Sequence, residues 1–432
     1  MPAPDPDALT NTGLSTRAVH GGTAPDPATG ARITPIYQTA SYVFEDVAHA
    51  QRLFNLDEFG QIYSRITNPT VQALEGKMAA LDGGVGATAA ASGHAAQFLA
   101  LLPLMEAGDE IVSSRNLYGG SITQFGQSFK RLGWHATFVD PTDPENFRKR
   151  ISPRTRAIFT ESLSNPGGLM VDLEAIAAVA HDAGIPLIVD NTLATPALCR
   201  PFEWGADICV YSTTKFIAGH GNAIGGVIVD SGGFQWDERT PALTTPNAAY
   251  HGTNFREKFG ALAYTVYGHA VGLRDFGPAM APMTAFLTLT GAETLTLRMA
   301  RHSENATEVA THLENHPAVA WVSYAGLASS QSFGLARKYL ADGAGAVLTF
   351  GLKGGYEAGI KVVESCRLFS HLANVGDTRS LIIHPASTTH RQLSDEDRAA
   401  AGAGPDVVRL SVGIEDAADL IADLDQALAA SP

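Results

Sequence analysis

The sequence predicts an α/β protein with a large domain built on a mostly parallel sheet and a smaller C-terminal α+β domain. Two observations carry this prediction. From about residue 66, short apolar runs alternate with helical patterns, and such alternation is typical of parallel strands covered by helices. In addition, a chain of 432 residues, 45% of them hydrophobic, is long enough to form two cores.

The chain divides into three predicted segments. Residues 1–65 predict an extended arm, because Pro, Gly, Thr and Asp are frequent there and no helical period is sustained. Residues 66–276 predict the large domain, and residues 277–432 predict the C-terminal domain. In the large domain, short apolar and β-branched runs predict strands at 111–112, 157–160, 187–190 and 227–229.

The clearest helix-strand unit of the large domain begins at Asp172. This residue can cap a helix, the apolar residues between 173 and 180 form one stripe, and Gly184 can end the helix. Residues 186–190 then predict a buried strand that ends in Asp190. The C-terminal domain shows two long helical patterns, followed by two strand-like runs, at 283–300, 302–315, 346–350 and 408–412.

The composition favours a small-molecule substrate. The chain has 30 Lys and Arg against 44 Asp and Glu, and its net charge of -14 disfavours general binding to nucleic acid or to anionic membranes. Residues 1–19 have no apolar signal core, and the most apolar window, 86–105, contains several polar residues. We therefore expect a cytoplasmic protein without a membrane segment or a metal site. Buried thiols are expected at Cys199, Cys209 and Cys366.

The strongest chemical signal surrounds Lys215. This lysine follows Ser212 and Thr214, and the run 216–226 that comes after it contains four glycines. In an extended segment the two hydroxyls lie on one face and can reach one phosphate beside the lysine, while the glycines allow a ligand to approach the backbone. A lysine that holds an aldehyde next to a phosphate site indicates pyridoxal 5'-phosphate (PLP). The alternative is a solvated surface charge.

Asp190 is the candidate partner of the cofactor ring. It ends the apolar run 187–189, and the carboxyl ends of strands form the ligand crevice of an open α/β sheet. A carboxylate at this position can pair with the pyridinium nitrogen of PLP, which keeps the ring cationic and able to accept electrons. The alternative is that Asp190 only caps the turn that follows the strand.

Further segments can complete a cofactor site. Ser92, Gly93 and His94 precede a helical pattern, so their amides and the serine hydroxyl can hold phosphate at a helix N-terminus. Tyr118 is a candidate for stacking on the ring, and Asn165 is a candidate donor to the phenolate oxygen of the cofactor. Each has a simpler alternative. Ser92 can be a plain helix cap and His94 a packed side chain. Tyr118 can be a half-buried loop residue, and Asn165 can simply form a turn.

Taken together, these segments resemble the γ-family of fold-type I PLP enzymes, the Cys/Met metabolism group of cystathionine synthases and lyases, methionine γ-lyases and acylhomoserine sulfhydrylases. The resemblance runs from about residue 16 to about residue 428 and rests on the motifs at 63–70, 190–192, 212–226 and 408–413. It implies that a fold-type I large domain holds PLP through Lys215, Asp190, Tyr118, Asn165, Ser92, Gly93, His94, Ser212 and Thr214.

Within this family the sequence is most similar to the sulfhydrylase branch. The segment 368–380 carries Asn374 where the lyases usually have Ser, and the resemblance implies that Asn374 and Arg409 hold the substrate carboxylate. Arginine suits such a bidentate task. Gly120 stands where methionine γ-lyases typically have Cys, whereas His94 departs from the Met of many members.

The resemblance also implies an activity and an assembly. The expected reaction is a γ-replacement that converts O-acetyl-L-homoserine and sulfide, or methanethiol, to L-homocysteine, or L-methionine, and acetate, with Lys215 and Tyr118 as catalytic residues. The alternatives within enzymes are a cystathionine γ-synthase and a methionine or cystathionine γ-lyase. A cofactor-free α/β binding protein is a further alternative. Tyr63 and Arg65 are expected to reach the phosphate of a neighbouring subunit, which implies a homodimer at least and usually a tetramer.

Overall fold

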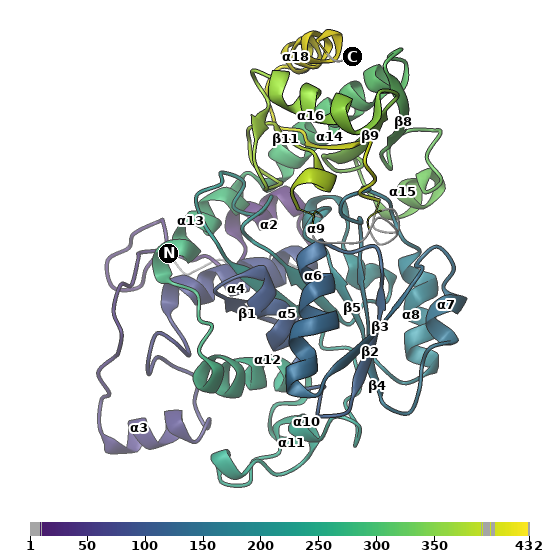
Figure 1. The fold of residues 1–432 in the computed structure, drawn as a ribbon. Helices are drawn as coiled ribbons and strands as arrows, with labels where there is room; N and C mark the ends of the chain where they lie inside the picture. Colours follow the sequence, from purple (N-terminus) through teal and green to yellow (C-terminus); the bar gives the residue numbers. More distant parts are fainter. Residues whose placement is uncertain (1–8, 10, 390, 392–397, 399–401, 431–432) are drawn as a thin grey trace.

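Two separate sheets form the framework of the protein (Figure 1). The structure is a computed structural model, which describes residues 9, 11–389, 391, 398 and 402–430. Parts of the predicted arm and C-terminal domain therefore lie outside the described residues. The larger sheet is formed by residues 86–230 and the smaller one by residues 319–411, and we propose a domain boundary between them at residue 276.

The larger sheet has seven strands in the order β1-β7-β6-β5-β4-β2-β3. Neighbouring strands from β3 to β6 run parallel, whereas β7 runs antiparallel to both of its neighbours. The predicted mostly parallel sheet is therefore confirmed. The strands span β1 Gly86–Ala90, β2 Glu110–Ser114, β3 His135–Val139, β4 Thr155–Glu161, β5 Leu187–Asp190, β6 Ile208–Tyr211 and β7 Gly226–Asp230.

The central strands are apolar on both faces because helices cover both faces of the sheet. Along β5, Leu187 and Val189 belong to one hydrophobic cluster, while Ile188 belongs to the other. This alternation is the period of two that a strand imposes on its side chains. The continuous apolar runs that predicted the strands thus report burial from two sides.

Helices and short helical turns pack around the larger sheet. The predicted unit at Asp172 is confirmed, because this side chain accepts a hydrogen bond of 3.2 Å from the amide of Ala175 and caps α8. The main helices are α4 Pro69–Asp82, α5 Gly93–Leu101, α6 Gly119–Thr123, α7 Glu145–Arg148, α8 Leu173–Asp182, α9 Thr195–Leu198, α10 Pro241–Thr244, α11 Phe255–Phe259 and α12 Ala263–Tyr267. The π-helical segments are η1 Gln124–Ser128 and η6 Gly268–Phe276, and the short 3-10 turns are η2 Phe129–Leu132, η3 Pro201–Trp204, η4 Ala248–Tyr250 and η5 Gly260–Leu262.

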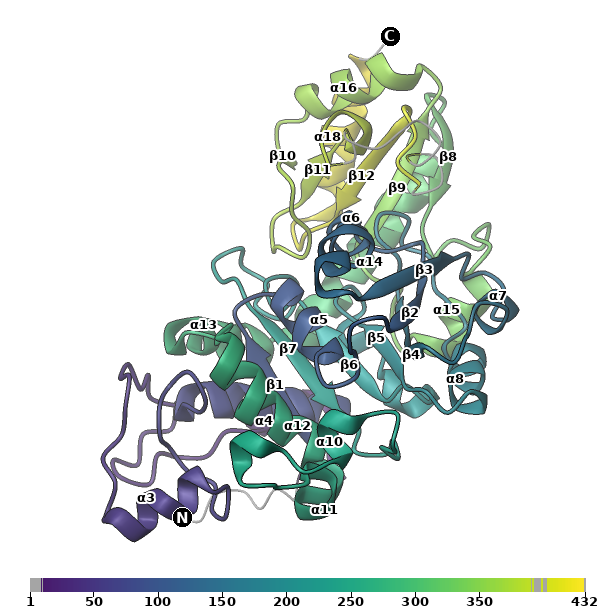
Figure 2. The same ribbon diagram turned by 60° about the horizontal axis from the view of Figure 1, so that its bottom comes forward.

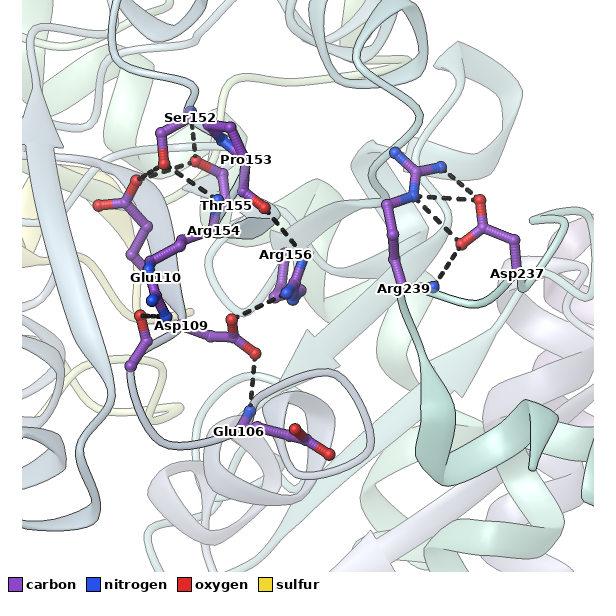
Figure 3. Close-up of polar contacts among 11 residues, drawn as sticks. Glu106, Asp109, Glu110, Ser152, Pro153, Arg154, Thr155, Arg156, Asp237 and Arg239 are labelled. Carbon is purple, nitrogen blue, oxygen red and sulfur yellow. Dashed lines mark hydrogen bonds and ion pairs between the residues drawn. The ribbon is translucent and has the colours of Figure 1, made fainter. Parts of the chain in front are cut away.

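A polar network ties the amino ends of β2 and β4 together (Figure 3). Glu110 Oε1 accepts hydrogen bonds of 2.6 Å from Ser152 Oγ and 3.1 Å from Thr155 Oγ1. Beside it, Arg156 pairs with Asp109 at 2.9 Å. Figure 3 also shows Arg239 pairing with Asp237. These contacts fix the end of the sheet opposite to the carboxyl ends of the strands, where ligands are expected.

The N-terminal arm is less regular than the large domain but is not fully extended. It contains two helices, α2 Leu14–His20 and α3 Val47–Phe54, so the predicted extended conformation is wrong in these places. α3 is capped by Asp46, which accepts a hydrogen bond of 2.6 Å from the amide of His49. Figure 2 shows α3 at the edge of the molecule, away from both sheets. Several apolar arm residues are exposed, among them Val43 at 97%.

The C-terminal part has a five-stranded sheet in the order β10-β11-β12-β9-β8, in which only β10 and β11 pair in parallel. The predicted strands at 346–350 and 408–412 match β9 and β12 within two residues. Its elements are β8 Val319–Ser323, α15 Phe333–Tyr339, β9 Val347–Leu352, α16 Gly355–Ser365, β10 Ser370–His371, β11 Leu381–Ile383, η7 Pro385–Ser387, β12 Val407–Ser411 and α18 Ala417–Ala429.

The two long predicted helices break at a different residue. They form α13 Pro282–Glu293 and α14 Leu295–Glu314, so the chain bends at Thr294 and not near residue 301. The Thr294 hydroxyl bonds to the carbonyl oxygen of Gly291 at 3.3 Å, and such local side-chain bonds compete with helix continuation. In the described part of the chain, no helix is both long and apolar enough to cross a membrane.

Candidate active site

A cavity of about 270 Å³ lies where the two sheets meet, at the carboxyl ends of β4, β5 and β6. Eleven of the thirteen predicted site residues line it, although they come from widely separated parts of the chain. They are Ser92, Gly93, His94, Tyr118, Asn165, Asp190, Ser212, Thr214, Lys215, Asn374 and Arg409.

Lys215 lies in a turn that follows β6. Its amide donates to the carbonyl oxygen of Ser212 at 3.2 Å, and its own carbonyl oxygen accepts from the amide of Gly219 at 2.8 Å. The prediction that this segment is extended is therefore wrong, because the chain turns immediately after the strand ends. Ser212 and Thr214 nevertheless both line the cavity. Gly225 fixes Thr214, since its amide donates to Thr214 Oγ1 at 3.0 Å.

The Lys215 amine is largely buried and close to another cation. Burial and the nearby Arg409 guanidinium lower the pKa of Lys215 to about 8. Its Nζ donates a hydrogen bond to Asn374 Oδ1. Only an unprotonated amine can attack an aldehyde, so the lowered pKa increases the reactive fraction of this lysine near neutral pH.

Asp190 caps the turn that follows β5 and also lines the cavity. Its Oδ1 accepts a hydrogen bond of 3.0 Å from the amide of Thr192 in the following turn. Its Oδ2 accepts a second hydrogen bond, of 3.0 Å, from Gln97 Nε2. The side chain is buried, and this burial raises its pKa. Among the described residues, no Lys, Arg or His forms an ion pair with it, so a cationic ring in the cavity would supply its missing partner.

The N-terminus of α5 lies on the lysine side of the cavity. Ser92 Oγ caps the helix by accepting a hydrogen bond of 3.1 Å from the amide of Ala95. A Cβ atom at Gly93 would stand only 2.7 Å from Ser212 Cβ, so this close approach requires glycine. Amides at a helix N-terminus bind anions well, and the hydroxyls of Ser212 and Thr214 line the same cavity.

Tyr118 and His94 stack against each other beside the cavity. Their ring centroids are 5.7 Å apart and their planes differ by 29°. Burial lowers the pKa of His94, which keeps its imidazole neutral. A Cβ atom at Gly120 would lie 2.5 Å from Tyr118 Cε1 and 2.8 Å from His94 Cε1. The stacked pair therefore requires glycine at position 120.

Two buried polar residues that support the site were not predicted from the sequence. Glu161 accepts hydrogen bonds of 2.6 Å from the amide of Tyr118 and 3.0 Å from the amide of Asn165. Glu161 ends β4 as Asp190 ends β5, and this position at the carboxyl end of a strand is the sequence signal that indicates it. Gln97 lies within an otherwise apolar helix, and no local pattern reveals its contact with Asp190. The unpredicted lining residues are Gln97, Glu161, Leu163, Thr192, Leu193, Ile224, Ala373, Val375 and Thr389.

Arg409 enters the cavity from β12 of the smaller sheet. Its guanidinium donates hydrogen bonds of 3.1 Å to Asn165 Oδ1 and 3.2 Å to the carbonyl oxygen of Asn374. The residue is 5% exposed, and burial lowers its pKa to about 10, so it remains a cation at neutral pH. The structure thus brings together the two residues predicted to hold a substrate carboxylate.

Tyr63 and Arg65 do not line this cavity. Both lie exposed on the arm, where the Arg65 guanidinium stands 5.0 Å from the centroid of the Tyr63 ring. Their predicted contact with the phosphate of a neighbouring subunit stays a prediction.

The residues around the cavity fit PLP. Lys215 offers a reactive amine, Asp190 offers a buried carboxylate that has no ion-pair partner in the described part of the chain, and the start of α5 offers amides to a phosphate. A mostly parallel α/β sheet with this site defines the class of PLP-dependent enzymes of amino-acid metabolism.

The chain belongs to the Cys/Met metabolism PLP-dependent enzyme family, whose model matches residues 15–429. It is 52% identical to O-acetyl-L-homoserine sulfhydrylase 1 of Thermus thermophilus, over 96% of this chain and 100% of the relative. It is 48% identical to O-acetyl-L-homoserine sulfhydrylase of Leptospira meyeri, over 96% of each chain. Homocysteine synthase of Schizosaccharomyces pombe is 50% identical, over 96% of this chain and 98% of the relative.

A solved structure of a Campylobacter jejuni protein, assigned as an O-acetylhomoserine (thiol)-lyase, has the same fold. The TM-score is 0.94 at 40% sequence identity, over 97% of this chain and 100% of the other. That structure holds N'-pyridoxyl-lysine-5'-monophosphate, in which the cofactor is joined to a lysine. Membership of a PLP-dependent family rules out the cofactor-free alternative.

Proposed function

We propose that the chain catalyses a γ-replacement that converts O-acetyl-L-homoserine and sulfide to L-homocysteine and acetate. With methanethiol in place of sulfide, the product is L-methionine. The observation that carries the proposal is that Lys215, Asp190 and Arg409 line one cavity. The names of the near full-length relatives, which are O-acetyl-L-homoserine sulfhydrylases and homocysteine synthases, support the choice of reaction.

The residues around the cavity divide into five tasks toward the cofactor. Lys215 holds the aldehyde, Asp190 pairs with the ring nitrogen, and Tyr118 stacks on the ring. When bound, PLP supplies an electron-accepting ring that stabilises negative charge at the α-carbon of an amino acid. Asn165 donates to the phenolate oxygen, and the phosphate is held by Ser92, Gly93, His94, Ser212 and Thr214.

The substrate is oriented by its carboxylate. Arg409 is a buried cation, and together with Asn374 it provides donors for a carboxylate in the half of the cavity near the smaller sheet. Its hydrogen bonds to Asn165 and Asn374 hold the guanidinium in place. A carboxylate bound there places the α-carbon near Lys215, whose unprotonated Nζ removes the α-proton. Tyr118, which lines the same cavity, assists proton transfer.

We also propose that the enzyme works in the cytoplasm as a homotetramer of two dimers, with Tyr63 and Arg65 completing the site of a neighbour. Exposed apolar arm residues such as Phe59, at 66% exposure, support a subunit contact. The three cysteines are free, and those at 199 and 209 are buried, as is usual for proteins of a reducing compartment.

Product analysis tests the reaction. Purified enzyme with O-acetyl-L-homoserine and sulfide should form homocysteine much faster than it forms α-ketobutyrate without sulfide. Parallel reactions with L-cysteine as nucleophile, with methionine and with cystathionine test the γ-synthase and γ-lyase alternatives. Dominant release of α-ketobutyrate from methionine would place the chain with the lyases and refute the proposal.

A further inference from the structure

His269 lies where three segments of the chain meet. It belongs to the π-helical segment η6, and π-helices are frequent at functional sites. Its Nδ1 lies 2.9 Å from the carbonyl oxygen of Ile66 at the base of the arm, and its Nε2 lies 3.2 Å from the carbonyl oxygen of Ala87 on β1. Glu75 Oε1 of α4 lies 3.4 Å from the same Nε2.

These neighbours determine the charge of His269. Carbonyl and carboxylate oxygens only accept hydrogen bonds, so both ring nitrogens must donate, and only the imidazolium carries two N–H groups. A neutral ring would direct a lone pair at one of the two carbonyl oxygens, which is unfavourable where the side chain is only 16% exposed. Burial alone lowers the pKa of His269, but Glu75 and the two carbonyl groups together raise it above its ordinary value.

The imidazolium therefore joins the arm to the sheet. Ile66 directly follows Arg65, and the amides of Ile66 and Thr67 donate to the carbonyl oxygen of Tyr63 at 2.9 and 3.1 Å. On the other side, β1 leads through Ser92 into α5, and a Cβ atom at Gly268 would stand 2.7 Å from Thr88 Oγ1. The close packing of η6 on β1 leaves the ring little freedom.

We propose that protonated His269 is a positioning residue that fixes the base of the arm so that Tyr63 and Arg65 reach the phosphate site of the neighbouring subunit. This inference rests on the shared site of the proposed function. The charge would otherwise be unbalanced in a partly buried position, and Glu75, which also accepts a hydrogen bond of 2.8 Å from the amide of Ala89, balances it.

The proposal has a defined pH direction. The imidazolium is present below the pKa of His269 in the folded protein and is lost as the pH rises through that raised value. Its loss leaves one carbonyl group without a donor and loosens the arm. Other charged or titratable groups that line the adjacent cavity of about 400 Å³ are Glu58 of the arm, Tyr250 of η4, His251 after η4 and Arg274 of η6 itself.

The test uses holoenzyme and measures the dissociation constant of PLP by equilibrium dialysis. His269→Gln should weaken PLP binding roughly tenfold, the scale of one lost hydrogen bond to a charged group. In an Arg65→Ala background the same change should have no further effect. His312→Gln is the matched control, because His312 pairs with Asp425 at 2.6 Å in the C-terminal part and should leave PLP binding unchanged.

A second readout separates positioning from general stability. In the unmutated enzyme, PLP binding should weaken as the pH rises above the pKa of His269, and His269→Gln should abolish that part of the profile. Glu75→Gln removes the anion and should move the same loss to lower pH. This variant keeps the proposal testable if His269→Gln folds poorly.

Each outcome decides the question. Equal weakening by His269→Gln with and without Arg65 means a purely structural role and overturns the inference, as does an unchanged dissociation constant. If Arg65→Ala alone leaves PLP binding intact, the shared site and this inference are both wrong. Formation of homocysteine by the unmutated enzyme tests the proposed reaction independently of these results.

Discussion

Arg298 on α14 donates a hydrogen bond of 2.7 Å to the carbonyl oxygen of Phe216, the residue that follows Lys215. The same guanidinium donates to the carbonyl oxygens of Ile217 at 3.1 Å and Gly291 at 2.6 Å. The residue is buried, and burial lowers its pKa to about 10. Among the described residues no carboxylate pairs with it. Three backbone carbonyl groups and the Thr294 hydroxyl, which accepts from Arg298 Nε at 3.2 Å, satisfy the cation. Arg298 thereby fixes the turn that carries the lysine.

Arg298→Met should destabilise the protein and disturb the lysine turn. The change leaves two or three buried carbonyl groups without donors, which should lower the free energy of unfolding by about 2–4 kcal/mol. Urea denaturation of the apoenzyme measures this loss. Arg298→Lys is the matched variant, because it keeps the charge with fewer donors. Its free energy of unfolding should lie between those of the unmutated protein and Arg298→Met. Equal stability of all three proteins would contradict the role given to Arg298.

The lowered pKa of Lys215 predicts how apoenzyme takes up PLP. Only the free amine attacks the aldehyde, so the rate of uptake should rise with pH and level off above a pKa of about 8, not near the ordinary lysine value of 10.5. Stopped-flow absorbance of the cofactor measures this rate. Arg409→Gln removes a nearby cation and should move the midpoint to higher pH. A rate that still rises steeply at pH 10 in the unmutated enzyme would contradict the prediction.

Much of the large domain could be predicted because its signals are local. The run 187–189 is apolar since helices cover both faces of β5, and the carboxyl end of this strand lies at the ligand crevice for topological reasons. Asp190 could be found from that position alone. The helix capped by Asp172 was equally local, since cap, stripe and terminal glycine lie within a few residues of each other.

What the sequence did not reveal depends either on contacts between distant residues or on local bonds that compete with a regular pattern. Gln97 touches Asp190 across 93 positions of the chain, and nothing in the pattern of α5 indicates it. The break at Thr294 depends on one local hydroxyl bond, which competes with strong helical periodicity on both sides. The turn at Lys215 resembles a strand in the sequence, because Ser212 and Thr214 are two residues apart and such residues share one face of an extended chain.

Gln97 should tune the charge on Asp190. Its Nε2 donates to the carboxylate, and this hydrogen bond opposes the rise that burial causes in the pKa of Asp190. Gln97→Met should therefore raise that pKa further and weaken PLP binding by roughly tenfold, the worth of one charge-assisted bond. Asp190→Asn should retain some PLP but slow turnover much more, since the ring loses its anionic partner. Similar turnover in both variants would argue that Asp190 only caps its turn.

Gly120 should tolerate no side chain while His94 and Tyr118 are stacked. A Cβ atom would stand 2.5 Å from the Tyr118 ring, a distance at which something must move. Gly120→Cys should therefore displace Tyr118 and reduce homocysteine formation at least about tenfold. Adding His94→Ala to Gly120→Cys makes room beside Tyr118 and should restore part of the lost homocysteine formation. Full activity of Gly120→Cys by itself would show that the stack is not needed.

Mixed oligomers test whether neighbouring subunits share each active site. Arg65→Ala and Lys215→Ala subunits should be nearly inactive by themselves, the first for want of a phosphate contact and the second because it lacks the cofactor amine. In a mixed dimer, one site contains both native residues and the other contains both substitutions. Random mixing makes half of the dimers mixed, so roughly a quarter of the native activity should return. Native mass spectrometry of differently tagged subunits measures the mixing, and a Lys215→Ala mixture with Lys215→Met serves as the control that cannot recover. Mixed dimers that form and stay inactive would show that Arg65 acts within its own subunit.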